Sequence, residues 1–320
     1  MDVQRWIARQ ESQWYQLEFL LNQAERKGLR SFSATQLQQL SSLYRTVSSD
    51  LARARARQVG SAITEQLQSL TLRSYSQIYQ GGRRQEWQAI CEFFRWGFPA
   101  IVQKTWLYTA VAIGLFVSGG LISWWYAWRD PEYINLIVPT GIIHLVQDEG
   151  KLWMGSIIGI EPLASTQIMT NNISVTFATL AGGILAGLGT LFILWSNGLQ
   201  IGAIAALVGQ NHLAYPFWAF VLPHGSLELP AIFLSGGAGL LLAQGLVFPG
   251  RYKRLDALKL AGAQAIQIMF GVVPMLVIAG VIEGFFSPNP AIPSAIKYLM
   301  GGSLLWGLIV YLRRQRTQPS

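Results

Sequence analysis

A run of 66 consecutive residues, 162–227, contains no lysine, arginine, aspartate or glutamate. Soluble chains carry about a quarter charged residues, whereas this chain of 320 residues carries 12%. A single membrane-crossing helix needs roughly 20 mostly apolar residues, and the uncharged run is much longer than that. The sequence therefore predicts an all-α, polytopic membrane protein.

Other protein classes are excluded by the composition. The 51% share of hydrophobic residues excludes a disordered chain, and the single cysteine, Cys91, excludes a disulfide framework or a cluster of thiolate ligands. The formal net charge of +8 does not indicate nucleic-acid binding, because positive residues near the cytoplasmic ends of spans account for it.

Six apolar segments make up the predicted transmembrane domain, 105–312: they are 105–127, 173–196, 199–222, 228–248, 262–285 and 293–312. The third is interrupted by Gly209-Gln210-Asn211-His212, which predicts a broken or re-entrant segment. Irregular backbone at that depth survives only where protein buries it or where it lines a wet cavity. No secretory signal is predicted, because a charged, amphipathic stretch precedes the first span.

The charges are segregated along the chain. Residues 1–104 hold 14 Lys/Arg against 8 Asp/Glu, 250–260 is also basic, and 313–320 forms a basic tail, whereas 129–171 has a net charge of −3. With six spans, all three basic regions fall on one side and the acidic region on the other. The positive-inside rule then predicts a multi-pass protein of the cell membrane with cytoplasmic N- and C-termini.

Residues 1–83 are predicted to form a cytoplasmic head of three amphipathic helices. Apolar residues recur at helical spacing in each, namely Trp6, Trp14, Leu17, Leu21 and Ala24, then Leu37, Leu40, Tyr44, Val47 and Leu51, then Ile63, Leu67, Leu70 and Ile78. Such stripes pack on one another in a small bundle. We find no convergent acid, base or nucleophile here, so the head is interpreted as a docking or oligomerisation platform.

Residues 84–104 are predicted to form an interfacial helix on the membrane. Trp87, Phe94 and Arg95 represent its mixture of aromatic and basic residues, and Pro99 is expected to break it ahead of the first span. A second basic set, Arg53, Arg55 and Arg57, either contacts anionic lipid headgroups or forms a solvated charged face.

A polar cluster is predicted around the third and fourth spans. Its members are Asn197, His212, His224, Ser226 and Glu228. His224 and Glu228 are four residues apart, so on a helix they share a face, and we expect them to meet at the outer end of the fourth span. A carboxylate at membrane depth is a functional candidate, although Glu228 could instead pair with His224 or cap the helix start.

Three further residues near these spans are interpreted individually. Pro230 can occupy the first turn of the fourth span. Glu283 could join a polar pathway, and Lys297 is expected to extend toward the membrane surface.

Catalytic interpretations of this cluster are weak. His224-x-x-x-Glu228 is not the H-E-x-x-H motif of zinc proteases, although His212 could supply a third ligand. Ser226 is not presented in a G-x-S-x-G turn, which argues against a hydrolase dyad with His224. No catalytic, cofactor-binding or metal-binding residue and no cofactor is predicted, and a non-enzymatic role is favoured.

Several of these motifs together resemble the stage II sporulation protein M family, also called DUF95. They are the run PHGSLELPAIFLSGGAG over 223–239, the run Asn197-Gly198-Leu199-Gln200-Ile201-Gly202, and Phe98-Pro99 ahead of the first span. The resemblance covers nearly the whole chain and implies a helical cytoplasmic head followed by several spans. It implies that Asn197, His224, Gly225, Glu228 and Pro230 belong to a structural or functional core. Sporulating members of the family take part in engulfment beside a peptidoglycan hydrolase and a third membrane protein, and no catalytic residues are established.

Three functions compete on these grounds. The first is a non-enzymatic scaffold in the bacterial envelope, the second a transporter or channel, and the third an intramembrane hydrolase. A water-filled cavity reaching Glu228 would favour transport, a solid glycine-packed bundle would favour scaffolding, and a bound metal would favour hydrolysis. Expected partners are membrane lipids, envelope proteins bound through the head, and a second copy of the chain, because pairs such as Gly183 and Gly187 let helices approach closely.

Overall fold

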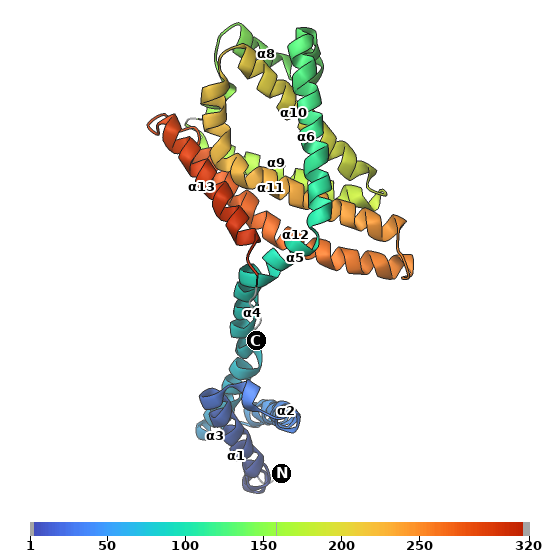
Figure 1. Cartoon of the computed structure of the whole chain (residues 1–320). Coiled ribbons are helices and arrows are strands. Elements are labelled where there is room, and N and C mark those ends of the chain that lie inside the picture. Colours follow the sequence, from blue (N-terminus) through green and yellow to red (C-terminus); the bar gives the residue numbers. More distant parts are fainter. Residues whose placement is uncertain (1–2, 158, 316–320) are drawn as a thin grey trace. The chain divides into compact units, whose positions relative to one another are not determined.

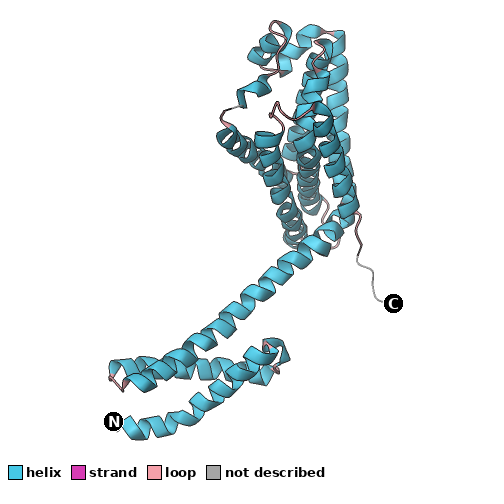
Figure 2. Ribbon diagram, turned by 90° about the vertical axis from the view of Figure 1, so that its left-hand side faces the viewer, coloured by secondary structure: helices cyan, strands magenta, loops and turns pink. Residues whose placement is uncertain are grey.

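The computed structural model describes residues 3–157 and 159–315. These residues fold into helices joined by turns and loops (Figures 1 and 2). The chain divides into two compact units, Met1–Glu92 and Phe93–Ser320, each with its own core. The helical class and an N-terminal helical region are as predicted.

The first unit is built on three helices, α1 (Val3–Lys27), α2 (Ala34–Ala56) and α3 (Ser61–Tyr75). Gly28 ends α1 with a φ of 76°, a conformation that glycine adopts without strain. A capping box starts α2, where the Ser33 side chain accepts from the backbone N–H of Gln36 and the Gln36 side chain accepts from the N–H of Ser33. A π-helical turn (Ser76–Gln80) then leads into α4 (Gly81–Glu92).

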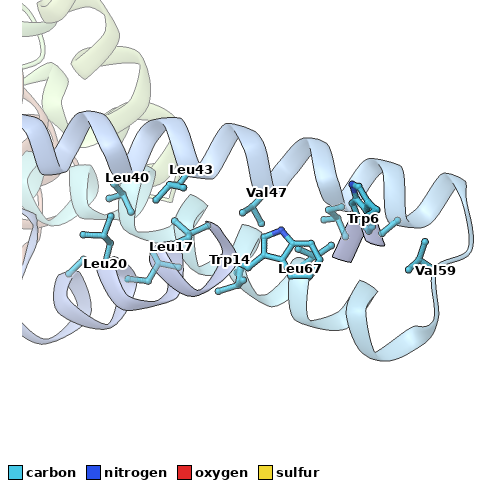
Figure 3. Packing of buried hydrophobic residues seen from close by; sticks show 14 of the residues in the cluster. Trp6, Trp14, Leu17, Leu20, Leu40, Leu43, Val47, Val59 and Leu67 are labelled. Atoms are coloured by element: carbon cyan, nitrogen blue, oxygen red, sulfur yellow. The ribbon is translucent and has the colours of Figure 1, made fainter. Parts of the chain in front are cut away.

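The apolar stripes of this unit meet in one core (Figure 3), except that the predicted stripe residue Leu37 is exposed. Leu17, Val47 and Leu67, one from each helix, are fully buried. The core also contains a charge, since Asp50 is 1% exposed. Its carboxylate accepts a hydrogen bond of 3.1 Å from Trp14 Nε1 and lies 4.0 Å from Arg53 Nη1. The buried carboxylate is thus tied to both α1 and its own helix.

The prediction that Pro99 breaks the chain before the first span is wrong. Helix α4 continues through a π-helical turn (Phe93–Gly97) into α5 (Phe98–Lys104), and Pro99 lies in the first turn of α5. A proline in a first turn removes no intrahelical hydrogen bond. The break comes at Thr105, whose side chain and backbone both donate to the carbonyl of Ile101.

Five helices among the described residues are long and apolar enough to cross a membrane, rather than the predicted six. They are α6 (Trp106–Arg129), α10 (Leu188–Gln210), α11 (Ala214–Val247), α12 (Arg254–Val281), which continues to Phe286 as a π-helical turn, and α13 (Ser294–Leu312). The predicted span 173–196 is instead the end of α9 (Glu161–Ala181), a 3-10 turn (Gly182–Ile184) and the start of α10. Gly187, with a φ of 87°, completes this reversal.

The broken third segment is also a correction. The polar residues 209–212 end α10 and form the turn into α11, so the predicted segment 199–222 contains halves of two continuous helices. Pro230 is not in a first turn, because it and Pro223 lie inside the 34-residue α11. Interior prolines remove helix hydrogen bonds and bend the axis, and α11 changes direction along its length (Figure 1).

Glycines set the closest helix contacts of the second unit. A Cβ at Gly198 would overlap the backbone of Phe116, and a Cβ at Gly202 would overlap that of Gly120. Further along, the Gln210 side chain donates to the carbonyl of Ala127. Residue numbers rise together in both helices, so α6 and α10 are parallel. Gly183, one of the glycines predicted to join two copies, likewise packs against the backbone of Gly239 in the same chain, so the dimer stays a prediction without that support.

The basic segments of the second unit gather at one end. The Gln103 side chain donates to the carbonyls of Leu312 and Arg314, which joins α5 to the end of α13. Lys104 also lines the same surface cavity as Arg251, in the loop after α11. Because α6 and α10 both start near this end, the intervening chain must return to it, and α9 is the helix that does so.

Candidate functional site

Three titratable side chains meet inside the second unit. His224 and Glu228 come from α11, and Glu283 comes from the π-helical turn that extends α12. One ligand atom of each lies within 4.8 Å of the other two, and His224 Nε2 is 3.7 Å from Glu283 Oε1. We call these residues the His–Glu–Glu cluster.

Neighbouring groups hold the imidazole of His224 in place. The side chain is 6% exposed, and Nδ1 lies 3.1 Å from the Ser287 hydroxyl. The ring packs edge-on against Phe220, with centroids 5.3 Å apart. When Nδ1 donates to Ser287, the lone pair of Nε2 faces the carboxylates.

Lys297 does not compensate the carboxylates. Contrary to the expectation that it extends toward the membrane surface, it is buried, and its ammonium donates to the backbone carbonyl of Ser287 at 2.6 Å. Within the described ranges, no lysine or arginine nitrogen lies within 4.0 Å of Glu228 or Glu283. Glu283 Oε2 is buried and has no hydrogen-bond partner there. Two carboxylates this close in a low-dielectric interior need a proton or a cation between them.

The cluster faces a cavity of about 850 Å³. Its walls come mainly from α6, α9, α10, α11 and the segment around Trp153, and they are largely apolar, with Phe116, Trp124, Trp153, Phe217 and Trp218 among the lining residues. Its polar lining consists of the cluster and three amides, Asn171, Asn172 and Gln200. A cavity therefore reaches Glu228, which is the feature expected of a transporter rather than of a solid bundle.

The predicted polar cluster is only partly assembled. His224 and Glu228 approach each other as expected, but midway along α11 rather than at the end of a span. Asn197 donates to the carbonyl of Ile193 in its own helix, and Ser226 donates to that of Pro223. Neither residue lines the cavity, and His212 is exposed in the turn before α11, with a φ of 60°.

The positions of Ser226 and His212 exclude two of the catalytic arrangements that the sequence left open. Ser226 directs its hydroxyl into its own helix, so no Ser226–His224 dyad forms. His212 is not the third donor beside His224 and Glu228, because Glu283 occupies that place. A nitrogen and two carboxylates form a donor set that suits a divalent metal ion.

Sequence reasoning missed part of the site. Glu283 entered only as an alternative, and the amides of Asn171, Asn172 and Gln200 were not singled out. A signal was present, because Asn171-Asn172 is a paired amide within the 66-residue uncharged run. Paired amides inside an otherwise uncharged helical segment indicate a polar lining rather than a lipid-facing surface.

The predicted lipid-contacting residues lie at the following places. Arg53, Arg55 and Arg57 are exposed at the end of α2, with Arg55 donating to Gln68 at 2.9 Å. Trp87 is 66% exposed on α4. Arg95 is exposed and lies over the Trp96 ring, whereas Phe94 is half-buried and packs edge-on against Phe93. Their contact with lipid stays a prediction.

Two family models match parts of this chain. A family model described as Stage II sporulation protein M matches residues 112–288, which include the cavity-lining residues and the whole His–Glu–Glu cluster. A second, described as a domain of unknown function (DUF8413), matches residues 4–80.

Two relatives are uncharacterized proteins of Methanocaldococcus jannaschii. One, MJ0793, is 38% identical over 73 residues, which are 22% of this chain and 41% of the relative. The other, MJ0706, is 27% identical over 124 residues, which are 37% of this chain and 52% of the relative. The chain thus spans about half or less of the length of these curated relatives. No solved structure matches it.

Proposed function

The chain belongs to the stage II sporulation protein M family of helical membrane proteins, and from this premise we propose that it carries a solute or ion across the membrane through the cavity above the His–Glu–Glu cluster. One observation carries the proposal, namely that a cavity of about 850 Å³ ends on two carboxylates and an imidazole inside the helix bundle. Ionisable residues at membrane depth are costly and mark substrate or ion pathways. Scaffolding alone gives no reason to retain them.

The proposed orientation places the basic end of the second unit in the cytoplasm. Lys104, Arg251 and Arg314 belong to that end, and the positive-inside rule then puts both ends of the chain on the cytoplasmic side. Helix α9 supplies the return crossing, so the chain passes through the bilayer six times, although only five helices are apolar enough to do so alone.

Thiol accessibility tests the passage of a solute without knowing the solute. In a Cys91→Ser background, the variants Ala205→Cys and Val221→Cys place thiols in the cavity lining. A charged, membrane-impermeant thiol reagent should modify both when added to right-side-out vesicles and also when added to inside-out vesicles. Phe192→Cys is the control, because Phe192 is 73% exposed on α10 and does not line the cavity. Labelling of both cavity thiols from one face only would contradict passage.

A second candidate function is the docking of envelope proteins on the head. Tyr15 and Phe19 on α1 and Leu72 on α3 are 57%, 70% and 59% exposed, and exposed apolar side chains of this size are typical of protein-binding surfaces. Replacing Phe19 by glutamate should abolish co-purification of a bound protein and leave labelling of the cavity thiols unchanged. Unchanged co-purification would argue against docking at α1.

A further inference from the structure

We propose that His224, Glu228 and Glu283 bind one divalent transition-metal cation of the Zn²⁺ or Mn²⁺ type at the polar end of the cavity. This inference deepens the proposed function, since it names the ion that this site would take.

The donor atoms define the class of ion. Mg²⁺ and Ca²⁺ are held by oxygen ligands, whereas imidazole nitrogen combined with carboxylate oxygen suits Zn²⁺, Fe²⁺ and Mn²⁺. Three protein ligands with one open position are the arrangement of metal sites that exchange a water or a substrate. Here the open position would face the cavity, which the three side chains line together.

The imidazole is oriented as a metal ligand would be. Ligating histidines characteristically use their second ring nitrogen in a hydrogen bond that fixes the tautomer. His224 Nδ1 has the Ser287 hydroxyl at 3.1 Å for this purpose, which directs Nε2 toward Glu283. The His224 side chain is only 6% exposed, and its Nε2 lies 3.7 Å from Glu283 Oε1. The second ring nitrogen of this buried side chain therefore faces the two carboxylates.

The spacing of the three donors is close to that of a coordination shell. Metal–ligand distances of about 2.1 Å place the ligands of a tetrahedral ion about 3.4 Å apart. The separation of His224 Nε2 and Glu283 Oε1 is 3.7 Å, and all three donors lie within 4.8 Å of one another. Closure requires shifts of about 1 Å at the ends of glutamate side chains, which rotamer adjustments provide.

Charge balance supplies an independent argument. A dication neutralises two carboxylates and leaves a neutral imidazole, so the cluster becomes uncharged as a whole. Without a counter-charge, the buried Oε2 of Glu283 has no partner in the part of the chain that is described. Lys297, the nearest buried ammonium, is already directed to the carbonyl of Ser287.

The test is metal binding by the purified full-length protein in detergent. After treatment with a chelator, the protein is dialysed against ZnCl₂ alone or MnCl₂ alone, and bound metal is measured by mass spectrometry. We expect about one ion per chain at the cluster and at least a tenfold loss of affinity in Glu228→Gln and in Glu283→Gln, since mutation of a residue that only hydrogen-bonds to a ligand already costs about 10–100-fold. Zn²⁺ should also raise the thermal midpoint of the unmodified protein, which tests binding without any variant.

The matched control is an exposed set with the same donor types. His144 Nε2 lies 3.3 Å from Asp148 and Nδ1 lies 4.0 Å from Glu149, and all three side chains are exposed. His144→Gln should leave the tight site intact. Loss of the tight ion in His144→Gln, or its retention in both glutamate variants, would overturn the proposal, as would a thermal midpoint that Zn²⁺ does not change.

The outcomes separate this inference from the proposed function. Absence of metal binding together with thiol labelling from both faces would refute the metal site and leave passage standing, with the carboxylates sharing a proton. Metal binding together with labelling from one face would support the ion site and refute passage.

Discussion

Substituting alanine for Gly202 should separate the two parallel helices on which the cavity depends. A Cβ at this position would overlap the carbonyl group of Gly120, which is backbone and cannot rotate away. Alanine also favours the helix over glycine by about 1 kcal/mol, so the observed effect is a difference between two opposing contributions. The matched variant Gly114→Ala has the same helix preference, but its Cβ meets nothing within 4 Å.

The difference between these two variants isolates the clash. Overpacking a well-packed interior costs about 1–3 kcal/mol, so Gly202→Ala should be less stable than Gly114→Ala by that amount. The measurement is unfolding of the full chain in mixed detergent and dodecyl sulfate micelles, followed by circular dichroism. Gly209→Ala, whose Cβ would lie 3.5 Å from the Trp128 ring, should behave like Gly114→Ala. Equal stability of Gly202→Ala and Gly114→Ala would refute the close contact of α6 and α10.

Three further predictions concern the head and the orientation of the chain. Trp14→Phe removes the hydrogen bond to the buried Asp50 and should lower the free energy of unfolding of the head by about 1–3 kcal/mol, measured by chemical denaturation. The hydrogen bond from Arg73 lowers the pKa of Glu25 below its ordinary value of 4.5. This hydrogen bond therefore stabilises the head fully above pH 4.5, and the stabilisation is lost as the pH falls through the lowered pKa. In Arg73→Met, the thermal midpoint should fall less steeply as the pH is lowered on the acid side. A reporter enzyme that is active only outside the cytoplasm should be inactive when fused after the last residue and active when inserted between 148 and 152, and the opposite pattern would refute the orientation.

The head was predictable from sequence because its helices are amphipathic. In such helices, the periodicity of Trp14, Leu17 and Leu21 reports directly which face is buried, and all three are buried. Local signals also mark the helix ends, since α1 ends at Lys27, directly before a glycine, Gly28.

Less of the structure of the second unit could be predicted from its sequence, and the reason is physical. Within 162–227 no residue is charged and most helix faces are apolar, so periodicity does not separate one helix from the next or distinguish a turn from a break in a span. The residues 209–212 carried the signal of a polar interruption, and its position was right while its structural meaning was not. Likewise, prolines at 223 and 230 indicate a helix boundary by themselves, but tertiary packing keeps both inside α11.

The complete His–Glu–Glu cluster could not be predicted from local sequence patterns, because it depends on contacts between distant parts of the chain. The spacing of His224 and Glu228 is local and was sufficient to predict that they approach each other. Glu283 lies 55 residues beyond Glu228, and only the packing of α11 against α12 brings it to the cluster. Without an amphipathic pattern in α12, its sequence does not indicate which face Glu283 occupies.

Helix α9 has a consequence for how the chain is inserted during synthesis. Its hydropathy is below that of the five candidate spans, so transfer of α9 alone from the translocation channel into lipid is not favourable. Two hydrogen bonds tie it to later helices, since the Ser165 hydroxyl donates to the carbonyl of Gly280 in α12 and the backbone carbonyl of Thr176 accepts from the Ser235 hydroxyl in α11. Because Gly280 belongs to α12, we expect α9 to take up its place only after α12 has left the ribosome. A nascent chain stalled before that point would hold α9 outside the bundle, with the walls of the cavity incomplete.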